Sequence, residues 1–433
     1  FIYYFYKMNI SSLYELYLRN PSVQTDTRKL QPGDLFFALK GDNFNGNKFA
    51  KQAIEAGAAC AVIDEAAYAI DGKTFLVDDV LTALQELAKH HRQQFSIPFI
   101  AITGSNGKTT TKELVHAVLS RKYRTATTEG NLNNHIGIPL TILKIKSDAE
   151  IAVIEMGANH QREIAGYCTY TLPDYGIITN CGKAHLEGFG GVEGVRKGKG
   201  ELFDWLREHD GTAFVMWDYD YLRDMSQGLS HIITYGTTDA SIEGHTIKSE
   251  PFLEVSITYG AATGTIHSQL VGDYNLPNLL LAVTIGKHFS VPDEDIRKAI
   301  EAYQPSNSRS QLMQVGSNQI ILDAYNANPS SMKLAIENFA RLAAPHKVLM
   351  LGAMAELGAE SLSEHRQIIE LIGKFKWKEV VLVGGDFLNL QHHWISFPDS
   401  AAAKQWYLDQ HFEQTHLLVK GSRSMKMEKI LEA

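Results

Sequence analysis

A short loop between a predicted strand and a predicted helix carries residue types that can bind a phosphate group. The loop, Thr103-Gly104-Ser105-Asn106-Gly107-Lys108-Thr109-Thr110, follows the apolar run 99–102 and precedes a helix with an apolar face. Glycines let backbone N–H groups surround an anion, a lysine can reach the β- and γ-phosphates of a nucleotide, and a hydroxyl can ligate Mg²⁺. The common pattern has one more glycine, at the position of Ile102. The sequence therefore predicts a nucleotide-phosphate loop, and the alternative is a tight turn that binds no ligand.

Two further polar residues follow predicted strands of the same domain. Glu155 comes directly after the run 151–154, and His185 ends the segment 179–185, which begins where the next strand stops. Because the carboxyl ends of parallel strands meet at one edge of a sheet, a carboxylate there can hold Mg²⁺ beside the phosphate loop. Taken alone, Glu155 also fits a helix cap or a surface acid, and His185 also fits an ordinary loop or core histidine.

The glycine-rich segment 188–200 adds basic residues but no dinucleotide fingerprint. Such a fingerprint would need glycine where Glu193 stands, so a nicotinamide or flavin site is not supported. Two interpretations of Arg196, Lys197 and Lys199 are open. They form a basic patch exposed to solvent, or one of the lysines points into the cleft where the predicted metal ion would bind.

An alternation of predicted strands and helices positions these segments. Short strands at 35–38, 61–63 and 75–77 surround a helix at 47–56, and a helix from 80 to 94 leads to Pro98. Helical stretches separate the later strands, which favours right-handed βαβ units and a largely parallel sheet. After Ser308 the alternation restarts, with strands at 320–322, 348–351, 380–383 and 417–419 and helices near 331–343, 363–374 and 400–413.

This alternation, in a chain of 433 residues, predicts an α/β protein of three domains. We expect a small N-terminal α/β domain at 1–79, a central phosphate-loop domain with a parallel sheet at 80–308, and a Rossmann-like α/β domain at 309–433. Met8 opens a helix-like stretch, so we expect residues 1–7 to lie upstream of the natural start.

Composition excludes several classes of partner. The net charge is −8, from 41 Lys and Arg against 49 Asp and Glu, and no long basic run argues for nucleic acid. No apolar run reaches the roughly 18 residues of a membrane span. The 3 cysteines lie far apart and match neither a redox motif nor a zinc motif, which fits a reducing compartment. We therefore expect a cytoplasmic protein that acts on small molecules. We also expect a monomer, although the composition leaves the oligomeric state open.

Several motifs, in order along nearly the whole chain, identify a family. They are Asp26-Thr27-Arg28, the segment 32–41, the loop 104–110, Gly130-Asn131-Leu132-Asn133-Asn134, the segments 155–159 and 184–190, Lys199-Gly200-Glu201, Asn275-Leu276-Pro277-Asn278, Arg309, and the segment 323–329. Together these motifs resemble those of the Mur ligase family. The phosphate loop of that family lacks the same glycine, which accounts for Ile102.

The resemblance implies an ATP- and Mg²⁺-dependent ligase that forms an amide through an acyl phosphate. It assigns catalysis to Lys108, Glu155, His185, Lys199 and Arg309, and metal binding to Thr109, Glu155, His185 and Lys199. Lys199 matches a lysine that family members carbamoylate, a reaction that needs a neutral amine. Asn275 and Asn278 would approach the adenine, and Arg309 the phosphates. The other predicted nucleotide contacts are Gly104, Ser105, Asn106, Gly107, Lys108, Thr109, Thr110, Asp323 and Tyr325.

The resemblance also implies the substrates. The first domain would bind a UDP-sugar, with Asp26, Thr27 and Arg28 at the uridine nucleotide. The segments 352–358 and 420–423 look like those of one member and favour D-alanyl-D-alanine as the amine that is joined to UDP-N-acetylmuramoyl-tripeptide. Ala353 stands where some members have aspartate, and Lys420 and Arg423 also fit caps of a sheet edge or a helix. The remaining predicted substrate contacts are Asn131, Asn133, Asn134, Asn326, Asn328, Glu356, His365, Lys420, Ser422 and Arg423.

Two alternatives remain at this point. A folylpolyglutamate synthetase-type ligase shares the phosphate loop and the acyl phosphate, but it lacks a separate UDP-binding domain, and about 97 residues precede the loop's strand here. The second alternative is a phosphate-loop protein that acts as a nucleotide-gated binding module. The sequence leaves open whether the tripeptide ends in lysine or diaminopimelate.

Overall fold

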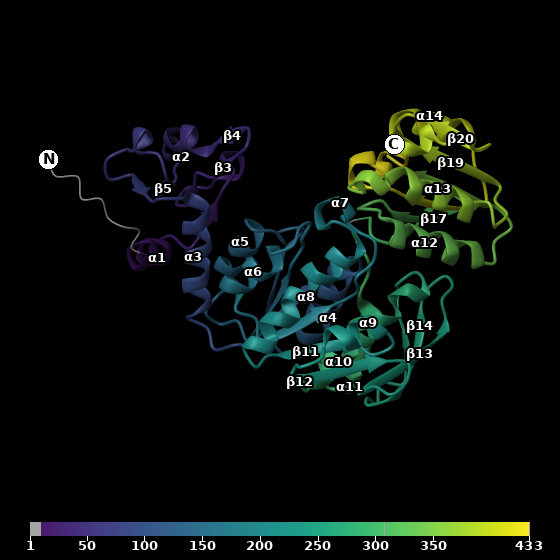
Figure 1. The fold of residues 1–433 in the computed structure, drawn as a ribbon, viewed down its shortest axis with the longest axis horizontal. Coiled ribbons are helices and arrows are strands. Elements are labelled where there is room, and N and C mark those ends of the chain that lie inside the picture. Colours follow the sequence, from purple (N-terminus) through teal and green to yellow (C-terminus); the bar gives the residue numbers. More distant parts are fainter. Residues whose placement is uncertain (1–9, 307, 433) are drawn as a thin grey trace. The chain divides into compact units, whose positions relative to one another are not determined.

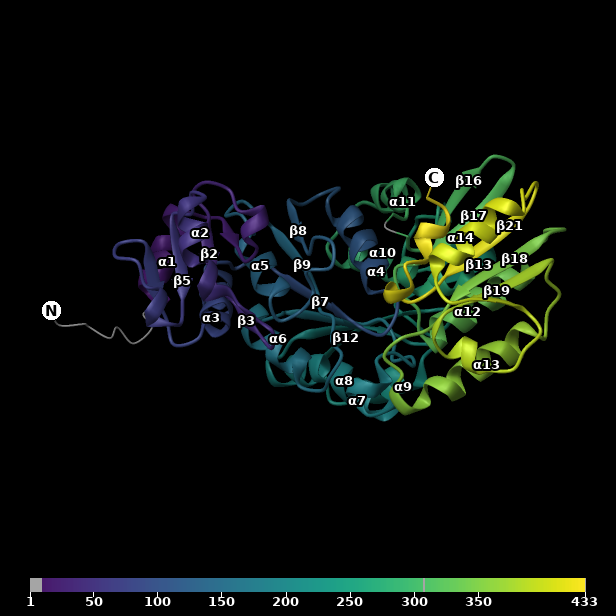
Figure 2. The ribbon, with the colours of Figure 1, turned by 90° about the horizontal axis from the view of Figure 1, so that it is seen from above.

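The computed structural model describes residues 10–306 and 308–432, so the prediction for residues 1–7 lies outside the described residues. The chain forms two compact units (Figures 1 and 2). The first contains residues 10–101, 123–157 and 163–175, and the second contains residues 102–122, 158–162, 176–306 and 308–432. Both units combine helices with sheets, and the predicted α/β class is confirmed.

The N-terminal part of the first unit is a small parallel sheet with helices. Its four strands, in the order β1-β2-β5-β6, pair in parallel. The buried side chains Phe36, Ala61 and Ile63 pack on Ala50 and Ala53 of α2, which explains the predicted strand–helix–strand pattern. The elements are α1 (Ile10–Arg19), β1 (Val23–Gln24), β2 (Leu35–Phe37), β3 (Lys40–Gly41), β4 (Phe44–Asn45), α2 (Ala50–Glu55), β5 (Cys60–Ile63), β6 (Thr74–Leu76) and α3 (Val80–Arg92).

A longer sheet carries the strands that follow. Its order in the described residues is β15-β14-β13-β12-β11-β10-β7-β9-β8. The pairs β8–β9, β11–β12 and β12–β13 are parallel, whereas β13–β14 and β14–β15 are antiparallel, an extension that the sequence did not predict. The strands are β7 (Phe99–Thr103), β8 (Thr125–Thr127), β9 (Ile151–Glu155), β10 (Tyr175–Ile178), β11 (Thr212–Met216), β12 (His231–Gly236), β13 (Ile242–Lys248), β14 (Glu254–Tyr259) and β15 (Thr265–His267).

Helices alternate with many of these strands along the chain. The helix α10 is buried over most of its length, with apolar residues on all sides. In the described residues no helix has both the length and the apolar character that crossing a membrane requires. The helices are α4 (Lys108–Leu119), α5 (Gly137–Leu143), α6 (Glu163–Thr171), α7 (Leu186–Phe189), α8 (Val192–Glu208), α9 (Asp220–Met225), α10 (Leu276–His288) and α11 (Asp293–Ala302).

The C-terminal part of the second unit contains a further sheet, of six strands in the described residues, in the order β16-β17-β21-β18-β19-β20. Within the part of the chain that the structure describes, β16 runs antiparallel to β17, and the other strand pairs of this sheet are parallel. Every strand and helix predicted after Ser308 is present. The elements are β16 (Gln311–Val315), β17 (Asn318–Asp323), α12 (Pro329–Arg341), β18 (Lys347–Gly352), α13 (Ser361–Ile372), β19 (Glu379–Val383), β20 (Ile395–Phe397), α14 (Ser400–Asp409) and β21 (His416–Lys420).

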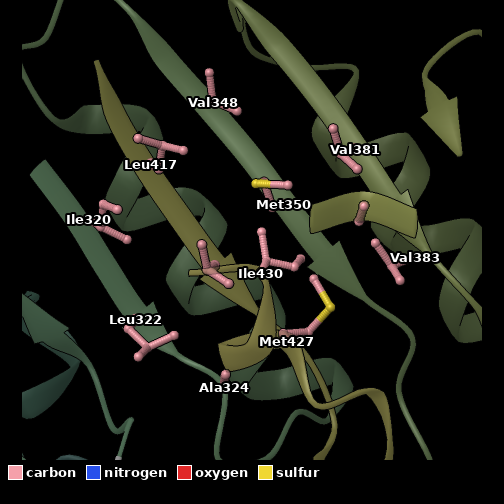
Figure 3. Close-up of a cluster of buried hydrophobic side chains, with 12 residues drawn as sticks. Ile320, Leu322, Ala324, Val348, Met350, Val381, Val383, Leu417, Met427 and Ile430 are labelled. Carbon is pink, nitrogen blue, oxygen red and sulfur yellow. The ribbon is translucent and has the colours of Figure 1, made fainter. Parts of the chain in front are cut away.

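Alternate residues of four strands build one core on a single face of this sheet (Figure 3). Because successive side chains of a strand point to opposite faces, the pairs at 320/322, 348/350, 381/383 and 417/419 all lie on the same side. Ala403 of α14 and the short C-terminal 3₁₀ helix Met427–Ile430 cover that side. The 3₁₀ helix Met427–Ile430 is therefore part of the core on this face of the sheet.

Replacing Leu417 with alanine is expected to destabilise this sheet by about 2–5 kcal/mol, because its side chain is 0% exposed and its removal leaves a cavity. The matched change, Leu388→Ala, removes a side chain that is 47% exposed and should cost far less. Hydrogen exchange of the β21 amides in increasing urea measures both. Equal protection in the two variants would contradict the packing described here.

Candidate active site

The phosphate-loop segment joins β7 to α4 and requires its two glycines. Gly104 has φ +143° and Gly107 has φ +80°, in the region that favours glycine. A Cβ atom on Gly104 would lie 2.0 Å from Oγ1 of Thr179, and one on Gly107 would lie 2.8 Å from Oδ1 of Asn278. The loop is thus packed too closely for side chains at either position. It leads directly into α4, and the N-terminus of a helix favours an anion.

The loop after β10 supports the phosphate loop. The Ser105 N–H donates to the Asn180 carbonyl at 2.9 Å, and the Ser105 hydroxyl donates to the Gly182 carbonyl at 2.9 Å. Asn180 also accepts from the Asn106 N–H at 3.1 Å, and the Thr179 hydroxyl donates to the Asn106 carbonyl at 2.6 Å. The sequence had marked the segment 179–185 for metal binding, and this supporting role was not predicted.

Lys108 and Thr109 occupy the first turn of α4. The Lys108 ammonium donates to the Gly104 carbonyl at 2.7 Å and to the Ser105 carbonyl at 3.3 Å, so it lies against its own loop. Thr109 is 4% exposed. A cation, a hydroxyl and aligned N–H groups are thus gathered where a polyphosphate can be bound.

Two buried asparagines lie beside this loop. Asn278 donates to Oδ1 of Asn275 at 2.8 Å and accepts from the Thr111 hydroxyl at 3.0 Å, and Asn275 donates to the Val271 carbonyl at 2.8 Å. The pair therefore fixes the start of α10 against α4. Their contact with adenine stays a prediction.

Lys199 is buried in the middle of α8. It is 1% exposed, its Nζ donates to the Ala158 carbonyl at 3.0 Å, and it lies 4.9 Å from the centre of the Phe189 ring. The solvated-patch interpretation is therefore wrong for this residue, although Lys197 is exposed. Burial raises the pKa of the nearby Cys181 thiol to about 12, so this group is protonated near neutral pH.

His185 and its neighbours contact residues from the C-terminal part of the second unit. The His185 ring pairs through Nδ1 with the Glu356 carboxylate, which holds the pKa of Glu356 below its usual value. Lys183 pairs with Glu364 at 2.5 Å. Glu356, which was predicted to contact a substrate, thus contacts His185, which was predicted to bind the metal.

Glu155 is the last residue of β9, so it lies at the C-terminal end of a strand, as predicted. It belongs to the first unit. It is 1% exposed, its N–H donates to the Thr128 hydroxyl at 2.9 Å, and its Oε1 accepts from Asn133 at 2.7 Å. Asn134 accepts from the Gly137 N–H at 2.8 Å, just at the start of α5, while Asn131 is exposed. Of the predicted asparagines in this segment, Asn133 is the one joined to the carboxylate.

The predicted metal ligands fit a hard cation by the chemistry of their donor atoms. Within residues 10–306 and 308–432 no group of three or more His, Cys, Asp or Glu side chains could hold a metal ion. The predicted set contains only two residues of those types, Glu155 and His185, and Thr109 adds a hydroxyl oxygen. A carbamate on Lys199 would supply the further carboxylate-like oxygens that Mg²⁺ prefers.

The ends of β17 and β21 place a second polar cluster. Asp323 accepts from the Ser310 N–H at 3.1 Å and from the Lys420 ammonium at 2.5 Å, and Lys420 is 2% exposed. The guanidinium of Arg309 lies 3.6 Å from the centre of the Tyr325 ring. The predicted nucleotide residues of this region are therefore gathered where the segment 308–310 meets the sheet.

Asparagines 326 and 328 follow this strand. Asn328 caps α12 by accepting from the Ser331 N–H at 2.9 Å, and its amide donates to Oδ1 of Asn106 in the phosphate loop at 2.7 Å. Asn326 accepts from the Ala327 N–H at 2.9 Å. Asn328 thus contacts the nucleotide loop, a contact that its motif alone did not predict.

Two predicted substrate residues, His365 and Ser422, contact the backbone of the segment 352–358. His365 is 0% exposed; its Nε2 accepts from the Met354 N–H at 3.0 Å and its Nδ1 donates to the Ser361 carbonyl at 2.7 Å. Ser422 is also buried and donates to the Ala353 carbonyl at 2.7 Å, whereas Arg423 is exposed. His365 and Ser422 therefore hold the loop, and direct contact of either with a substrate stays a prediction.

Asp26 and Arg28 form a pair in the first unit. Asp26 accepts from Nε and Nη2 of Arg28 at 2.8 and 2.7 Å and caps the 3₁₀ helix Thr27–Lys29. These bonds lower the pKa of Asp26 to about 2, so the carboxylate is ionised near neutral pH. The Arg28 guanidinium lies at the surface while it is bonded to Asp26. Contact of this pair with a uridine nucleotide stays a prediction.

Comparison with known families matches three domain models in order. Residues 21–92 match the Mur ligase family catalytic domain, residues 102–286 the Mur ligase middle domain, and residues 308–423 the glutamate ligase domain of Mur ligases.

Curated relatives and solved structures agree with these matches. The chain is similar to the UDP-N-acetylmuramoyl-tripeptide–D-alanyl-D-alanine ligase of Bacillus subtilis, with 35% identity over 98% of this chain and 97% of the relative. It is also similar to the Escherichia coli ligase of the same name, with 37% identity over 95% of this chain and 93% of the relative. A crystal structure of MurF from Acinetobacter baumannii matches with a TM-score of 0.85 and 30% identity, over 95% of this chain and 92% of that one. Identity at this level, over almost the full length and with the site motifs in place, shows that the chain belongs to the Mur ligase family.

Proposed function

We infer that the chain is an ATP-dependent amide ligase that adds D-alanyl-D-alanine to UDP-N-acetylmuramoyl-tripeptide. The product would be the UDP-N-acetylmuramoyl-pentapeptide of peptidoglycan synthesis, a step in cell-wall biogenesis that cell shape and division require. The observation that carries this inference is the match to the two curated ligases of that name from Bacillus subtilis and Escherichia coli, over at least 93% of the length of each. The packed phosphate loop, with Lys108 against it, supports the use of ATP.

The reaction joins two steps. The tripeptide carboxylate attacks the γ-phosphorus of ATP, which forms an acyl phosphate and releases ADP. The amine of D-alanyl-D-alanine then attacks the acyl carbon, loses a proton, and expels phosphate from a tetrahedral intermediate. Two anions meet in the first step, so positive charge must offset their repulsion. Lys108 and Arg309 supply such charge from the chain, and Mg²⁺ bound by Thr109, Glu155, His185 and carbamoylated Lys199 would supply more.

The substrates divide among three proposed domains at 1–79, 80–308 and 309–433. The family matches at 21–92, 102–286 and 308–423 support that division. We place the uridine nucleotide at Asp26–Arg28 and the adenine at Asn275 and Asn278. We place the incoming dipeptide near Lys420, Ser422 and Arg423. A net charge of −8, without a basic run, supports small-molecule substrates rather than nucleic acid. We propose that the chain acts in the cytoplasm, as a monomer and without a membrane partner.

Phosphate release tests this function directly. The chain is given ATP and Mg²⁺ with UDP-N-acetylmuramoyl-tripeptides that carry lysine or diaminopimelate, each with and without D-alanyl-D-alanine. We expect release only when tripeptide and dipeptide are both present, and the preferred tripeptide identifies the acceptor. Release stimulated by a folate and glutamate instead would favour the folylpolyglutamate-type ligase. Nucleotide binding without substrate-dependent release would favour a binding module.

A further inference from the structure

The loop that carries His185 is held at several points by residues far away in the sequence. Ser330 accepts the Lys183 N–H at 2.9 Å, and a Cβ on Gly182 would lie 2.8 Å from the same hydroxyl oxygen. The Lys183 ammonium donates at 2.5 Å to Glu364, which is 4% exposed. The position of this loop is therefore set by the α12 and α13 region.

His185 itself contacts Glu356 in the segment after β18. The Glu356 carboxylate pairs with Nδ1 of the imidazole, and the Glu356 carbonyl accepts the Glu187 N–H at 3.4 Å. Both residues have positive φ, +51° for His185 and +62° for Glu356, which non-glycine residues adopt infrequently. Two uncommon backbone conformations thus face each other and bring one carboxylate to one imidazole.

This contact places a carboxylate oxygen against Nδ1 of the ring. A negative charge beside Nδ1 favours the tautomer of the neutral imidazole that carries its proton there, and the lone pair of Nε2 is then available to a metal ion. We propose that Glu356 is a positioning residue, which holds His185 in the orientation and tautomer that bind the metal. The inference rests on the proposed role of His185 as a metal ligand. Because Glu356 belongs to the segment 352–358, the position of that segment would then affect the affinity of His185 for the metal.

The interaction can be removed without unfolding the chain. The Glu356 side chain is 52% exposed, and exposed ion pairs contribute little to stability. Glu360, which is exposed in the same loop and has no side-chain cap role at α13, offers a matched control. Glu356→Ala removes the acceptor, whereas Glu356→Gln keeps an acceptor oxygen without the charge.

The test measures Mn²⁺ binding to the full chain, with ADP present, by electron paramagnetic resonance. We expect Glu356→Ala to weaken Mn²⁺ binding about 10- to 100-fold, Glu356→Gln to weaken it less, and Glu360→Gln to leave it unchanged. The nitrogen coupling of the bound Mn²⁺ should weaken in Glu356→Ala. ADP affinity without metal should be the same in all variants, because the phosphate loop is untouched.

His185→Ala separates the two ways of failing. If that variant loses Mn²⁺ affinity while Glu356→Ala binds as well as the unmodified chain, or more tightly, the positioning role is overturned and His185 remains a ligand. If His185→Ala itself keeps full affinity and nitrogen coupling, the metal role of His185 in the proposed function fails, and the inference fails with it.

Discussion

Replacing Lys108 with alanine is expected to lower the turnover of the ligase reaction about 10²- to 10³-fold or more, with the fold retained. The ammonium lies against the Gly104 and Ser105 carbonyls, where it would meet the transferred phosphoryl group. Its charge is needed most when the tripeptide carboxylate approaches the γ-phosphate, so kcat should fall more than ADP affinity. Substrate-dependent phosphate release at saturating ATP measures the loss.

Lys122→Ala is the matched control for this variant. Lys122 lies beyond the other end of α4 and also donates to backbone carbonyls, those of Phe289 and Ser290 at 3.3 and 2.9 Å. It should keep nearly full turnover. Circular dichroism and the melting temperature verify the fold of both variants. A turnover for Lys108→Ala within about threefold of the unmodified chain would remove the phosphate-loop interpretation.

The second large effect is expected at Lys199. A lysine that is 1% exposed and lies against the Phe189 ring cannot act as a surface charge. If it is carbamoylated, Lys199→Ala removes a metal-bridging group, and activity should fall at least about 100-fold. Acetate or formate should restore part of the activity, because a short carboxylate fits the space that the side chain leaves.

Two further variants make the Lys199 result specific. Lys199→Met keeps most of the volume but cannot form a carbamate, so it should be inactive and less responsive to acetate than Lys199→Ala. Lys197→Ala changes an exposed neighbour on α8 and should have little effect. Activity of Lys199→Ala equal to that of the unmodified chain would exclude the carbamate, and a loss without any rescue by carboxylates would leave only a packing role.

The sequence was most informative where chemistry is encoded locally. The strand–loop–helix unit at 99–119 could be predicted because its glycines, lysine and flanking apolar residues lie within one short segment. The placement of Glu155 at the end of β9 followed from the rule that strand ends carry functional side chains. The core strands after Ser308 were predictable because their buried apolar runs are continuous.

What the sequence did not predict depends on tertiary pairing. Edge strands β16 and β20 lack a buried apolar run, so their pattern resembles that of a loop. The contact of Asn328 with Asn106 joins residues 222 positions apart. His365 shows a further limit: its motif marks it as important, but only the structure reveals that burial lowers its pKa and that both ring nitrogens are bonded to the backbone.

The burial of the cysteines has a practical consequence. Cys60, Cys168 and Cys181 are all buried free thiols, and burial raises the pKa of Cys60 to about 11 and that of Cys181 to about 12. Maleimides react with exposed thiolates, so the native chain should label slowly. A cysteine introduced at the exposed position Lys29 and another at Leu388 would then accept a donor and an acceptor dye without any prior removal of native thiols. Single-molecule energy transfer between the dyes could follow the chain through its catalytic cycle.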